Sequence, residues 1–232
     1  MNLYEIRAIL EKQEKSVFTI NEISKILKIN KKIASIYIVR MRKKGLISKI
    51  EKNKICITDD IFITASQLVF PSYISLTTAL YLHNIIPQII NKIYIVTAKK
   101  RRKSKISESD IVFIQTSKKM MYGYKKIRKG GGFIFLADIE KTIIDCLNFP
   151  RYCRLNYVFE AIKKADIKKL CEYLLILNKE VVNRRAGYLM DMAEISHDIK
   201  TRKKTIYKLN PTVERGGEFN KKWRLYINEK IK

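Results

Sequence analysis

The chain has 232 residues, of which 47% are hydrophobic, and its 48 Lys and Arg against 22 Asp and Glu give a formal net charge of +26. This length suits two modest domains, each able to bury its own core, and the periodic apolar residues exclude a disordered chain. No apolar run approaches the ~20 residues of a membrane span, and the N-terminus carries no signal-peptide core. We therefore expect a cytoplasmic protein without membrane contact.

Two capping pairs mark the first helices. Asn2 with Glu5 predicts one helix start, and Thr19 with Glu22 has the capping-box spacing that predicts a second. The apolar stripes of these helices consist of Leu3, Ile6, Ile9 and Leu10, and of Ile20, Ile23, Ile26 and Leu27.

A third helix and a hairpin follow. Asn30 is a good N-cap for a helix from Lys31 to Lys44, and Gly45 can adopt the positive φ that ends it. Apolar or alternating runs at 46–50 and 54–58 then predict a β-hairpin. Three helices followed by a hairpin form the order of a winged helix-turn-helix, a DNA-binding domain that we assign to residues 1–62.

The third helix carries the predicted DNA-reading face. At ~100° per residue, Ala34, Ile38 and Met41 share the side that packs on the first two helices. A recognition helix meets bases mainly through its first turns, so base-edge contacts are assigned to Lys31, Lys32, Ser35 and Ile36. Phosphate contacts are assigned to Arg40, Lys43, Lys52 and Lys54, and Asn53 completes the predicted DNA-binding set.

Alternatives remain open for this segment. Ile36 and Val39 on the outward face either touch thymine methyl groups or pack against the second domain. The segment can also serve as a protein-interaction module with solvated lysines, although its clustered positive charge favours DNA. Net charge alone is weak support, because a lysine-rich and isoleucine-rich composition can reflect an AT-rich genome.

Two further basic groups are predicted to lie in loops between strands. The first is the run Lys99–Lys105, whose residues Lys99, Lys100, Arg101, Arg102 and Lys103 form a candidate secondary patch. The second consists of Lys125, Lys126, Arg128 and Lys129. Three roles stay open for both basic groups: an extension of the DNA footprint, contact with an acidic protein partner, or a solvated loop. The following Gly130-Gly131-Gly132 lacks the Lys-Ser/Thr pair of a phosphate-binding loop and introduces a strand.

Residues 63–232 form the predicted second domain, after a connecting stretch at 59–68. Strands are expected at 93–97, 111–115, 133–136, 205–209 and 223–227. Ser75 and Asp138 cap two helices, and further helices are expected at 155–165, 167–177 and 181–192. Because strands and helices mix without strict βαβ alternation, the whole chain is predicted to be α+β.

Several motifs of this second part resemble the AbiEi family, the antitoxins and transcriptional regulators of type IV toxin–antitoxin systems. Pro71-Ser72-Tyr73-Ile74-Ser75, running into Ala79-Leu80 and His83, resembles the segment that opens the family's second domain. Ala137-Asp138-Ile139-Glu140-Lys141 with Ile144-Asp145 resembles its central motif. Arg185-Ala186-Gly187-Tyr188-Leu189 resembles its Arg-x-Gly-Tyr-Leu element, with Ala186 where a larger apolar residue is usual, and Trp223-Arg224-Leu225 also fits. The motifs occur in the family's order and cover most of the chain.

The resemblance implies a function in two parts. A winged-helix head would bind inverted repeats upstream of its own operon and repress it, and a C-terminal domain would counteract a nucleotidyltransferase toxin. The implied partners are double-stranded operator DNA and a cognate toxin, with a monomer or weak dimer that binds DNA cooperatively. The alternative is a stand-alone winged-helix repressor whose C-terminal domain senses a small molecule.

The motif residues also have physical interpretations. Glu140, Lys141 and Asp145 are expected to form polar contacts on a helix flank, and Arg185 to reach back to one of these carboxylates. Gly187 indicates the close approach of a neighbouring backbone. Two roles stay open for the family-motif residues as a set: they stabilise the fold, or they contact a toxin. The set comprises Ser72, Tyr73, Asp138, Glu140, Lys141, Asp145, Arg185, Gly187 and Tyr188.

The sequence argues against catalysis. Asp138, Glu140 and Lys141 have the residue types of a metal-dependent nuclease, but two of them are adjacent and the carboxylates begin a helix. With only two histidines, no nucleophile–base–acid set can be assembled. The four cysteines are widely spaced, and those at 56, 146 and 171 sit in apolar patterns typical of reduced thiols. We expect no enzyme activity, no cofactor and no metal.

Overall fold

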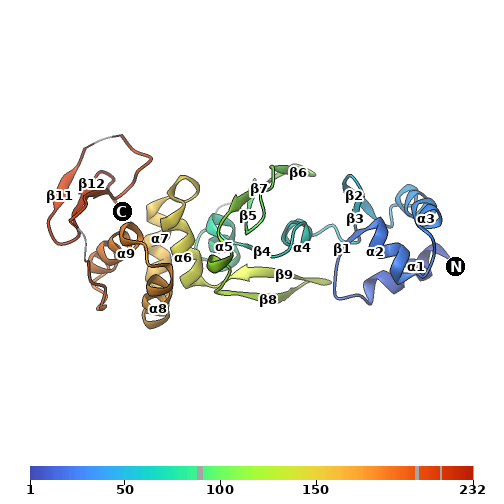
Figure 1. Cartoon of the computed structure of the whole chain (residues 1–232), viewed down its shortest axis with the longest axis horizontal. Coiled ribbons are helices and arrows are strands. Elements are labelled where there is room, and N and C mark those ends of the chain that lie inside the picture. The colour runs from blue at the N-terminus through green and yellow to red at the C-terminus, as the bar shows by residue number, and fades with distance from the viewer. Residues whose placement is uncertain (88–90, 202–203, 215, 232) are drawn as a thin grey trace. The chain divides into compact units, whose positions relative to one another are not determined.

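The computed structural model describes residues 1–87, 91–201, 204–214 and 216–231. These residues form helices and three sheets, which confirms the α+β class (Figure 1). Contacts divide the chain into two units. Unit 1 contains Met1–Ile74, Asn91–Thr116 and Lys126–Leu136, and unit 2 contains Ser75–Ile90, Ser117–Lys125 and Ala137–Lys232. The domain border predicted near residue 62 therefore lies inside unit 1.

The first part of unit 1, residues 1–58, is called the N-terminal module below. Its elements are α1 (Leu3–Glu11), β1 (Val17–Thr19), α2 (Ile20–Ile26), α3 (Lys31–Lys43), β2 (Ser48–Glu51) and β3 (Lys54–Cys56). Both predicted capping boxes are complete, and the side chain of Asn30 accepts from the backbone N–H of Ile33. The strand β1 was not predicted; it pairs antiparallel with β3 and completes a sheet in the order β1-β3-β2.

The core of the N-terminal module fixes the orientation of α3. Ala34 and Met41 are buried, and Ile38 packs against the same core, as predicted. Gly45 has the positive φ of +69° that ends the helix, and Asn53 has a φ of +64° in the hairpin turn. The opposite side of α3 is thereby turned to solvent.

The remainder of unit 1 is built around a six-stranded mixed sheet. Its strands are β4 (Ser72–Ile74), β5 (Lys92–Thr97), β6 (Ser104–Ile106), β7 (Ser109–Gln115), β8 (Tyr124–Lys129) and β9 (Gly132–Ala137), in the order β6-β7-β5-β4-β9-β8. Only the start of β8 and the last residue of β9 belong to unit 2. The three predicted strands of this region are confirmed as β5, β7 and β9.

Two predictions about loops were wrong. The stretch at 59–68 is not a simple connection: it contains α4 (Ile61–Gln67), because the carboxylate of Asp60 accepts from the backbone N–H groups of Phe62 and Ile63. The basic group at 125–129 is not a loop but β8, an edge strand. Lysines and arginines are common on edge strands, where they oppose pairing with other chains.

Unit 2 is mainly helical. Its helices are α5 (Leu76–Leu82), α6 (Ile139–Asn148), α7 (Leu155–Ile162), α8 (Ile167–Leu177) and α9 (Glu180–Met192), with short 3-10 turns at Lys118–Met120 and Pro150–Tyr152. The predicted helices are confirmed, with the side chain of Asp138 capping α6, whereas the side chain of Ser75 makes no cap hydrogen bond to α5. Helix α6 packs against α5, α7, α8 and α9. A small sheet, in the order β10-β12-β11, consists of β10 (Tyr207–Lys208), β11 (Glu218–Asn220) and β12 (Leu225–Ile227). Of the helices described, none is long and apolar enough to cross a membrane.

Candidate nucleic-acid interface

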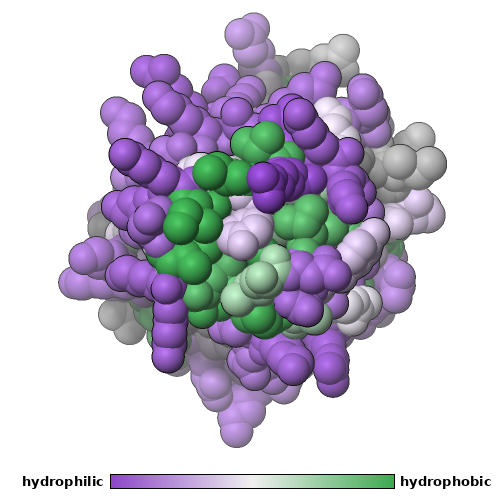
Figure 2. All heavy atoms as spheres, turned by 90° about the vertical axis from the view of Figure 1, so that its right-hand side faces the viewer, coloured by the Kyte–Doolittle hydropathy of each residue, from purple (hydrophilic) through white to green (hydrophobic). Residues whose placement is uncertain are grey.

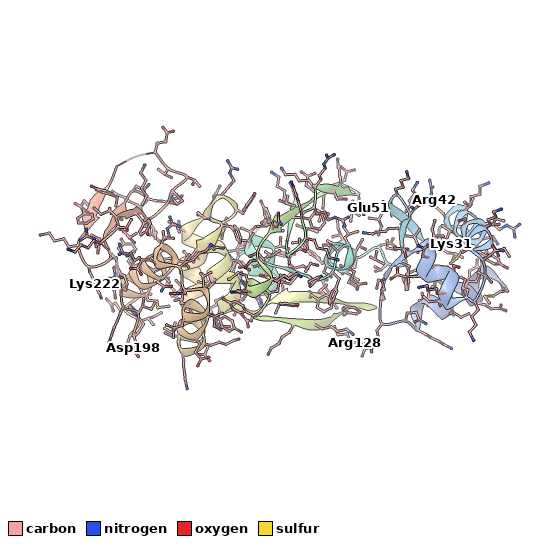
Figure 3. All side chains as sticks on the ribbon, viewed as in Figure 1. Lys31, Arg42, Glu51, Arg128, Asp198 and Lys222 are labelled. Atoms are coloured by element: carbon pink, nitrogen blue, oxygen red, sulfur yellow. The ribbon has the colours of Figure 1, made fainter. Side chains whose placement is uncertain are left out.

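The exposed face of α3 concentrates positive charge. Lys31, Lys32, Arg40 and Lys43 are exposed, as predicted, and Arg42 adds a fifth cation to the helix. Lys31 and Arg42 of this group are labelled in Figure 3. From residue 23 to residue 50 the sequence contains no Asp or Glu, so the helix has no acidic neighbour in sequence that neutralises it.

The charges at the start of α3 oppose the helix dipole. Lys31 and Lys32 occupy its first turn, where no acidic residue is present. The N-terminus of a helix favours negative charge by about 0.3–1 kcal/mol per group, so two cations there weaken the fold. Such an arrangement becomes favourable when a polyanion lies against this face. Ser35 is half-buried, and its hydroxyl donates to the carbonyl of Lys31 at 2.9 Å, which leaves its oxygen as an acceptor.

In the hairpin, the predicted phosphate contacts divide into two classes. Lys52 and Asn53 are exposed at the turn. Lys54 instead donates to the carbonyl of Leu68 at 2.6 Å and lies 3.3 Å from the carboxylate of Glu51. The ammonium of Lys54 is therefore directed toward the protein, and we assign Lys52 alone of these two lysines to a phosphate.

Glu51 also holds Arg101 of the secondary basic patch. Its carboxylate accepts from the guanidinium of Arg101 and, at 3.1 Å, from the hydroxyl of Ser104. Burial raises the pKa of Glu51, but the hydrogen bond from Arg101 and the nearby positive charges outweigh it and leave the pKa below its usual value. Arg101 thus links β2 to the chain before β6, while Lys99, Lys100, Arg102 and Lys103 remain exposed.

The basic edge strand β8 also contacts acidic residues of unit 1. Lys126 lies 2.6 Å from Glu14 and Lys129 lies 2.9 Å from Asp60. The hydrogen bond from Lys126 lowers the pKa of Glu14. Between β8 and the chain after α1 lies a groove of about 950 Å³, whose lining mixes cations such as Lys12 and Arg128 with carboxylates. These contacts join the sheet to the N-terminal module and make a continuous phosphate-binding track there less favourable.

The AbiEi-like motif residues of unit 2 form a buried polar network around the start of α6. The ammonium of Lys141 lies 2.5 Å from the carboxylate of Asp145, and these side chains are 0% and 2% exposed. The hydroxyl of Ser75 donates to the second oxygen of Asp145 at 2.8 Å, and the ring of Tyr122 lies 4.8 Å from the ammonium. The predicted contact of Lys141 and Asp145 is present, but in the core of the unit and not on a helix flank.

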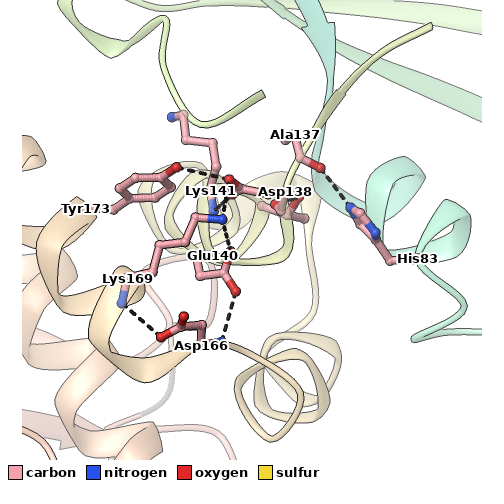
Figure 4. A network of polar contacts seen from close by, with 9 residues as sticks. His83, Ala137, Asp138, Glu140, Lys141, Asp166, Lys169 and Tyr173 are labelled. Carbon is pink, nitrogen blue, oxygen red and sulfur yellow. Dashed lines mark hydrogen bonds and ion pairs between the residues drawn. The ribbon is translucent and has the colours of Figure 1, made fainter. Parts of the chain in front are cut away.

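A second set of contacts joins α6 to α8 (Figure 4). The ammonium of Lys169 lies 2.8 Å from Asp138 and 2.9 Å from Glu140, and these hydrogen bonds outweigh desolvation and raise its pKa. Glu140 also accepts from the backbone N–H of Asp166 at 2.9 Å. The hydroxyl of Tyr173 donates to Asp138 at 3.0 Å, and burial together with the nearby carboxylates raises the pKa of Tyr173 to about 12. Sequence reasoning missed Lys169 and Tyr173, because nothing in their local pattern indicates these long-range partners.

Arg185 does not reach a carboxylate as predicted. Its guanidinium donates to the carbonyl of Leu147 at 3.1 Å and to that of Lys208 at 3.1 and 3.3 Å. Burial lowers the pKa of Arg185 to about 10. The residue does join α9 to α6, but through the carbonyl at the end of α6, which a helix leaves without a partner of its own.

The group that approaches Gly187 closely is a side chain, the ring of Trp223, and not a neighbouring backbone as predicted. A Cβ at this position would lie 2.0 Å from the ring of Trp223, whose indole N–H donates to Asp191 at 2.6 Å. We expect Gly187→Ala to lower the free energy of unfolding by about 1–3 kcal/mol, as overpacked cores do, although Ala normally stabilises a helix relative to Gly.

Urea unfolding followed by circular dichroism would measure this effect in every variant, including one that lacks Trp223. Combining Gly187→Ala with Trp223→Leu should recover part of the loss. A more stable Gly187→Ala protein would contradict the packing described here.

The burial of the motif residues favours a structural role for most of them. Ser72 and Tyr73 are fully buried, and the hydroxyl of Ser72 donates to the carbonyls of Ser66 and Val69 at 3.1 and 2.6 Å. Asp138 and Tyr188 keep partial exposure. Within the residues described, no three His, Cys, Asp or Glu side chains are grouped to hold a metal. The four thiols are free; those at 56 and 146 are buried as predicted, and that of Cys171 is half-buried.

No protein-family model matches the chain, and no curated protein matches it. The resemblance to the AbiEi family therefore rests on the motif residues themselves.

Proposed function

We propose that this chain is a DNA-binding transcription regulator whose N-terminal module is a winged helix. The observation that carries the proposal is α3, which has five exposed cations and no acidic residue, with Lys32, Arg40 and Lys43 on its outward face. The order α1-β1-α2-α3-β2-β3, with α2 and α3 separated by residues 27–30, suits a helix-turn-helix followed by a wing.

In this proposal α3 enters the major groove. Its first turns present Lys31, Lys32, Ser35 and Ile36 to base edges, while Arg40 and Lys43 meet phosphates on either side. Lys52 and Asn53 at the hairpin turn follow the backbone of the duplex. The exposed lysines and arginine at 99, 100, 102 and 103 add general electrostatic attraction.

The resemblance to the AbiEi family extends the proposal to a target and a second partner. The target is an inverted repeat upstream of the protein's own operon, and the partner is a nucleotidyltransferase toxin. The buried positions of Lys141, Asp145 and Arg185 support a scaffold role for them, so a toxin would contact other residues of the C-terminal part.

Binding to the protein's own upstream DNA tests the first part of the proposal. Full-length protein would be titrated with that duplex and with a scrambled duplex of equal length across a salt series. We expect a preference for the native sequence that persists at ~0.2 M salt. Equal and steeply salt-dependent binding to both duplexes would refute sequence-specific regulation.

Two lysines of the hairpin make a matched pair for the same assay. We expect Lys52→Ala to weaken binding to all duplexes and to lower the slope of log affinity against log salt by roughly one unit, because one phosphate contact is lost. Lys54→Ala should leave the slope unchanged, since its ammonium already contacts Leu68 and Glu51. Equal effects of the two substitutions would contradict the assignment of Lys52 to a phosphate.

A further inference from the structure

The basic face of α3 has an apolar centre. Ile33, Ile36 and Val39 are 40%, 51% and 54% exposed. Figure 2 faces the N-terminal module at this end and shows hydrophobic side chains gathered in one area with hydrophilic ones around it. Exposed isoleucine and valine side chains keep apolar area in contact with water, at about 25 cal/mol per Å², so their grouping calls for an explanation.

The helical positions define the pattern. At ~100° per residue, Ile36 lies nearly opposite the buried Ala34 and Met41, with Ile33 and Val39 within ~60° of it on either side. Lys32, Arg40 and Lys43 fall within ~40° of Ile36 along the helix. The face is therefore an apolar strip interleaved with cations, and its centre is the part of α3 that a groove would receive first.

This pattern fits DNA better than a protein partner. The cores of protein interfaces are depleted of lysine, whereas here Lys32 and Lys43 lie beside the central isoleucine. In the major groove, phosphates lie on both sides and the C5 methyl group of thymine projects from the base edge, where it accepts apolar contacts.

Hydrogen-bonded readout by α3 is correspondingly limited. The first two turns contain no Arg, Asn or Gln, the residue types that read guanine or adenine through two hydrogen bonds at once, although lysine can bond to guanine. The hydroxyl of Ser35 already donates to Lys31. Apolar contacts are thus the larger part of what this face can offer to a base pair.

We propose that Ile33, Ile36 and Val39 read thymine methyl groups, so that the protein selects A·T pairs with thymine turned toward α3 at the centre of each half-site. This inference rests on the proposed DNA-binding function. It gives these residues a specificity role, with Ile36 as the central contact, and it leaves Arg40 and Lys43 to position the helix on phosphates.

The test replaces thymines of the bound duplex by deoxyuridine, which removes the methyl group and keeps base pairing. At the thymine that contacts Ile36, we expect affinity to fall about fourfold for the lost methyl group. In Ile36→Ala the same replacement should have little effect, because the side chain that contacts the methyl group is gone. Ile176→Ala removes an isoleucine that is 58% exposed on α8 of unit 2, and it should preserve the full deoxyuridine effect.

The outcomes separate this inference from the proposed function. Specific binding that is insensitive to deoxyuridine at every thymine, or an effect that persists in Ile36→Ala, would overturn the methyl readout while leaving DNA regulation intact. Failure to distinguish the native duplex from a scrambled one would refute the proposed function itself. If Ile36→Ala weakens self-association in sedimentation and leaves the deoxyuridine effect intact, the strip is a protein interface and the inference is wrong.

Discussion

Replacing Asp145 with Ala is expected to lower the free energy of unfolding of unit 2 by about 3–5 kcal/mol. The substitution removes the carboxylate that the buried ammonium of Lys141 contacts at 2.5 Å, and breaking a buried pair from one side costs this much because the remaining charge stays out of water. Ser75 also loses its acceptor. Trp223, the single tryptophan of the chain, is buried in unit 2, so its fluorescence during urea unfolding reports on this unit.

Two controls show whether burial is the cause. Replacing both partners with apolar residues, as Lys141→Met with Asp145→Leu, should cost far less than Asp145→Ala alone, because no charge is then left inside. Lys163 and Glu160 form an ion pair of similar length at the surface, and Lys163→Ala should change stability by at most about 1 kcal/mol. A comparably small effect of Asp145→Ala would contradict the burial of the Lys141 ammonium described here.

The same pair shows where reasoning from sequence stops. Opposite charges at i and i+4 on a helix are typical of an exposed pair, and the sequence predicts their contact correctly. Their burial follows from residues outside α6. Ser75 lies 70 residues before Asp145, and Tyr122 lies 19 residues before Lys141. Tertiary packing therefore decides whether such a pair adds little to stability or dominates it.

Local chemistry was sufficient to predict where several helices begin and which face of α3 is buried. The caps at Asn2, Thr19, Asn30 and Asp138 act through side chains that contact backbone N–H groups two or three residues away, so the sequence alone locates them. The face of α3 is equally predictable, because Ala34 and Met41 repeat at helical spacing. The predicted DNA-reading face followed from these two facts.

Short strands and cation partners were not predictable in the same way. The strand β1 has only three residues, too few to show alternation, and exists because it pairs with β3 far along the chain. The exposed edge strand β8 has a loop-like composition. Lys54 looks as available as Lys52 in the sequence, and only the position of the Leu68 carbonyl separates them. The candidate site was thus predicted on α3 and only partly in the hairpin.

Replacing Lys32 with Glu is expected to stabilise the N-terminal module and to weaken binding to the native duplex at least ~100-fold. Stability should rise by about 0.3–1 kcal/mol, because a carboxylate in the first turn of α3 is favoured by the helix dipole. Binding should fall because a cation expected at a base edge becomes an anion that faces the negative potential of the duplex. Thermal unfolding and duplex titration at one salt concentration measure both effects.

Lys168→Glu provides the matched control for the loss of binding. Lys168 is exposed at the second position of α8, as Lys32 is in α3, and its replacement changes net charge by the same amount. DNA affinity should change far less than in Lys32→Glu, because the charge lies outside the proposed interface. Similar losses in both variants would mean that total charge, and not the face of α3, governs binding. A gain in stability together with a large loss of DNA affinity, seen in Lys32→Glu and not in Lys168→Glu, is the expected result. It would show that the cations of α3 destabilise the free protein and are balanced by the phosphates when DNA is bound.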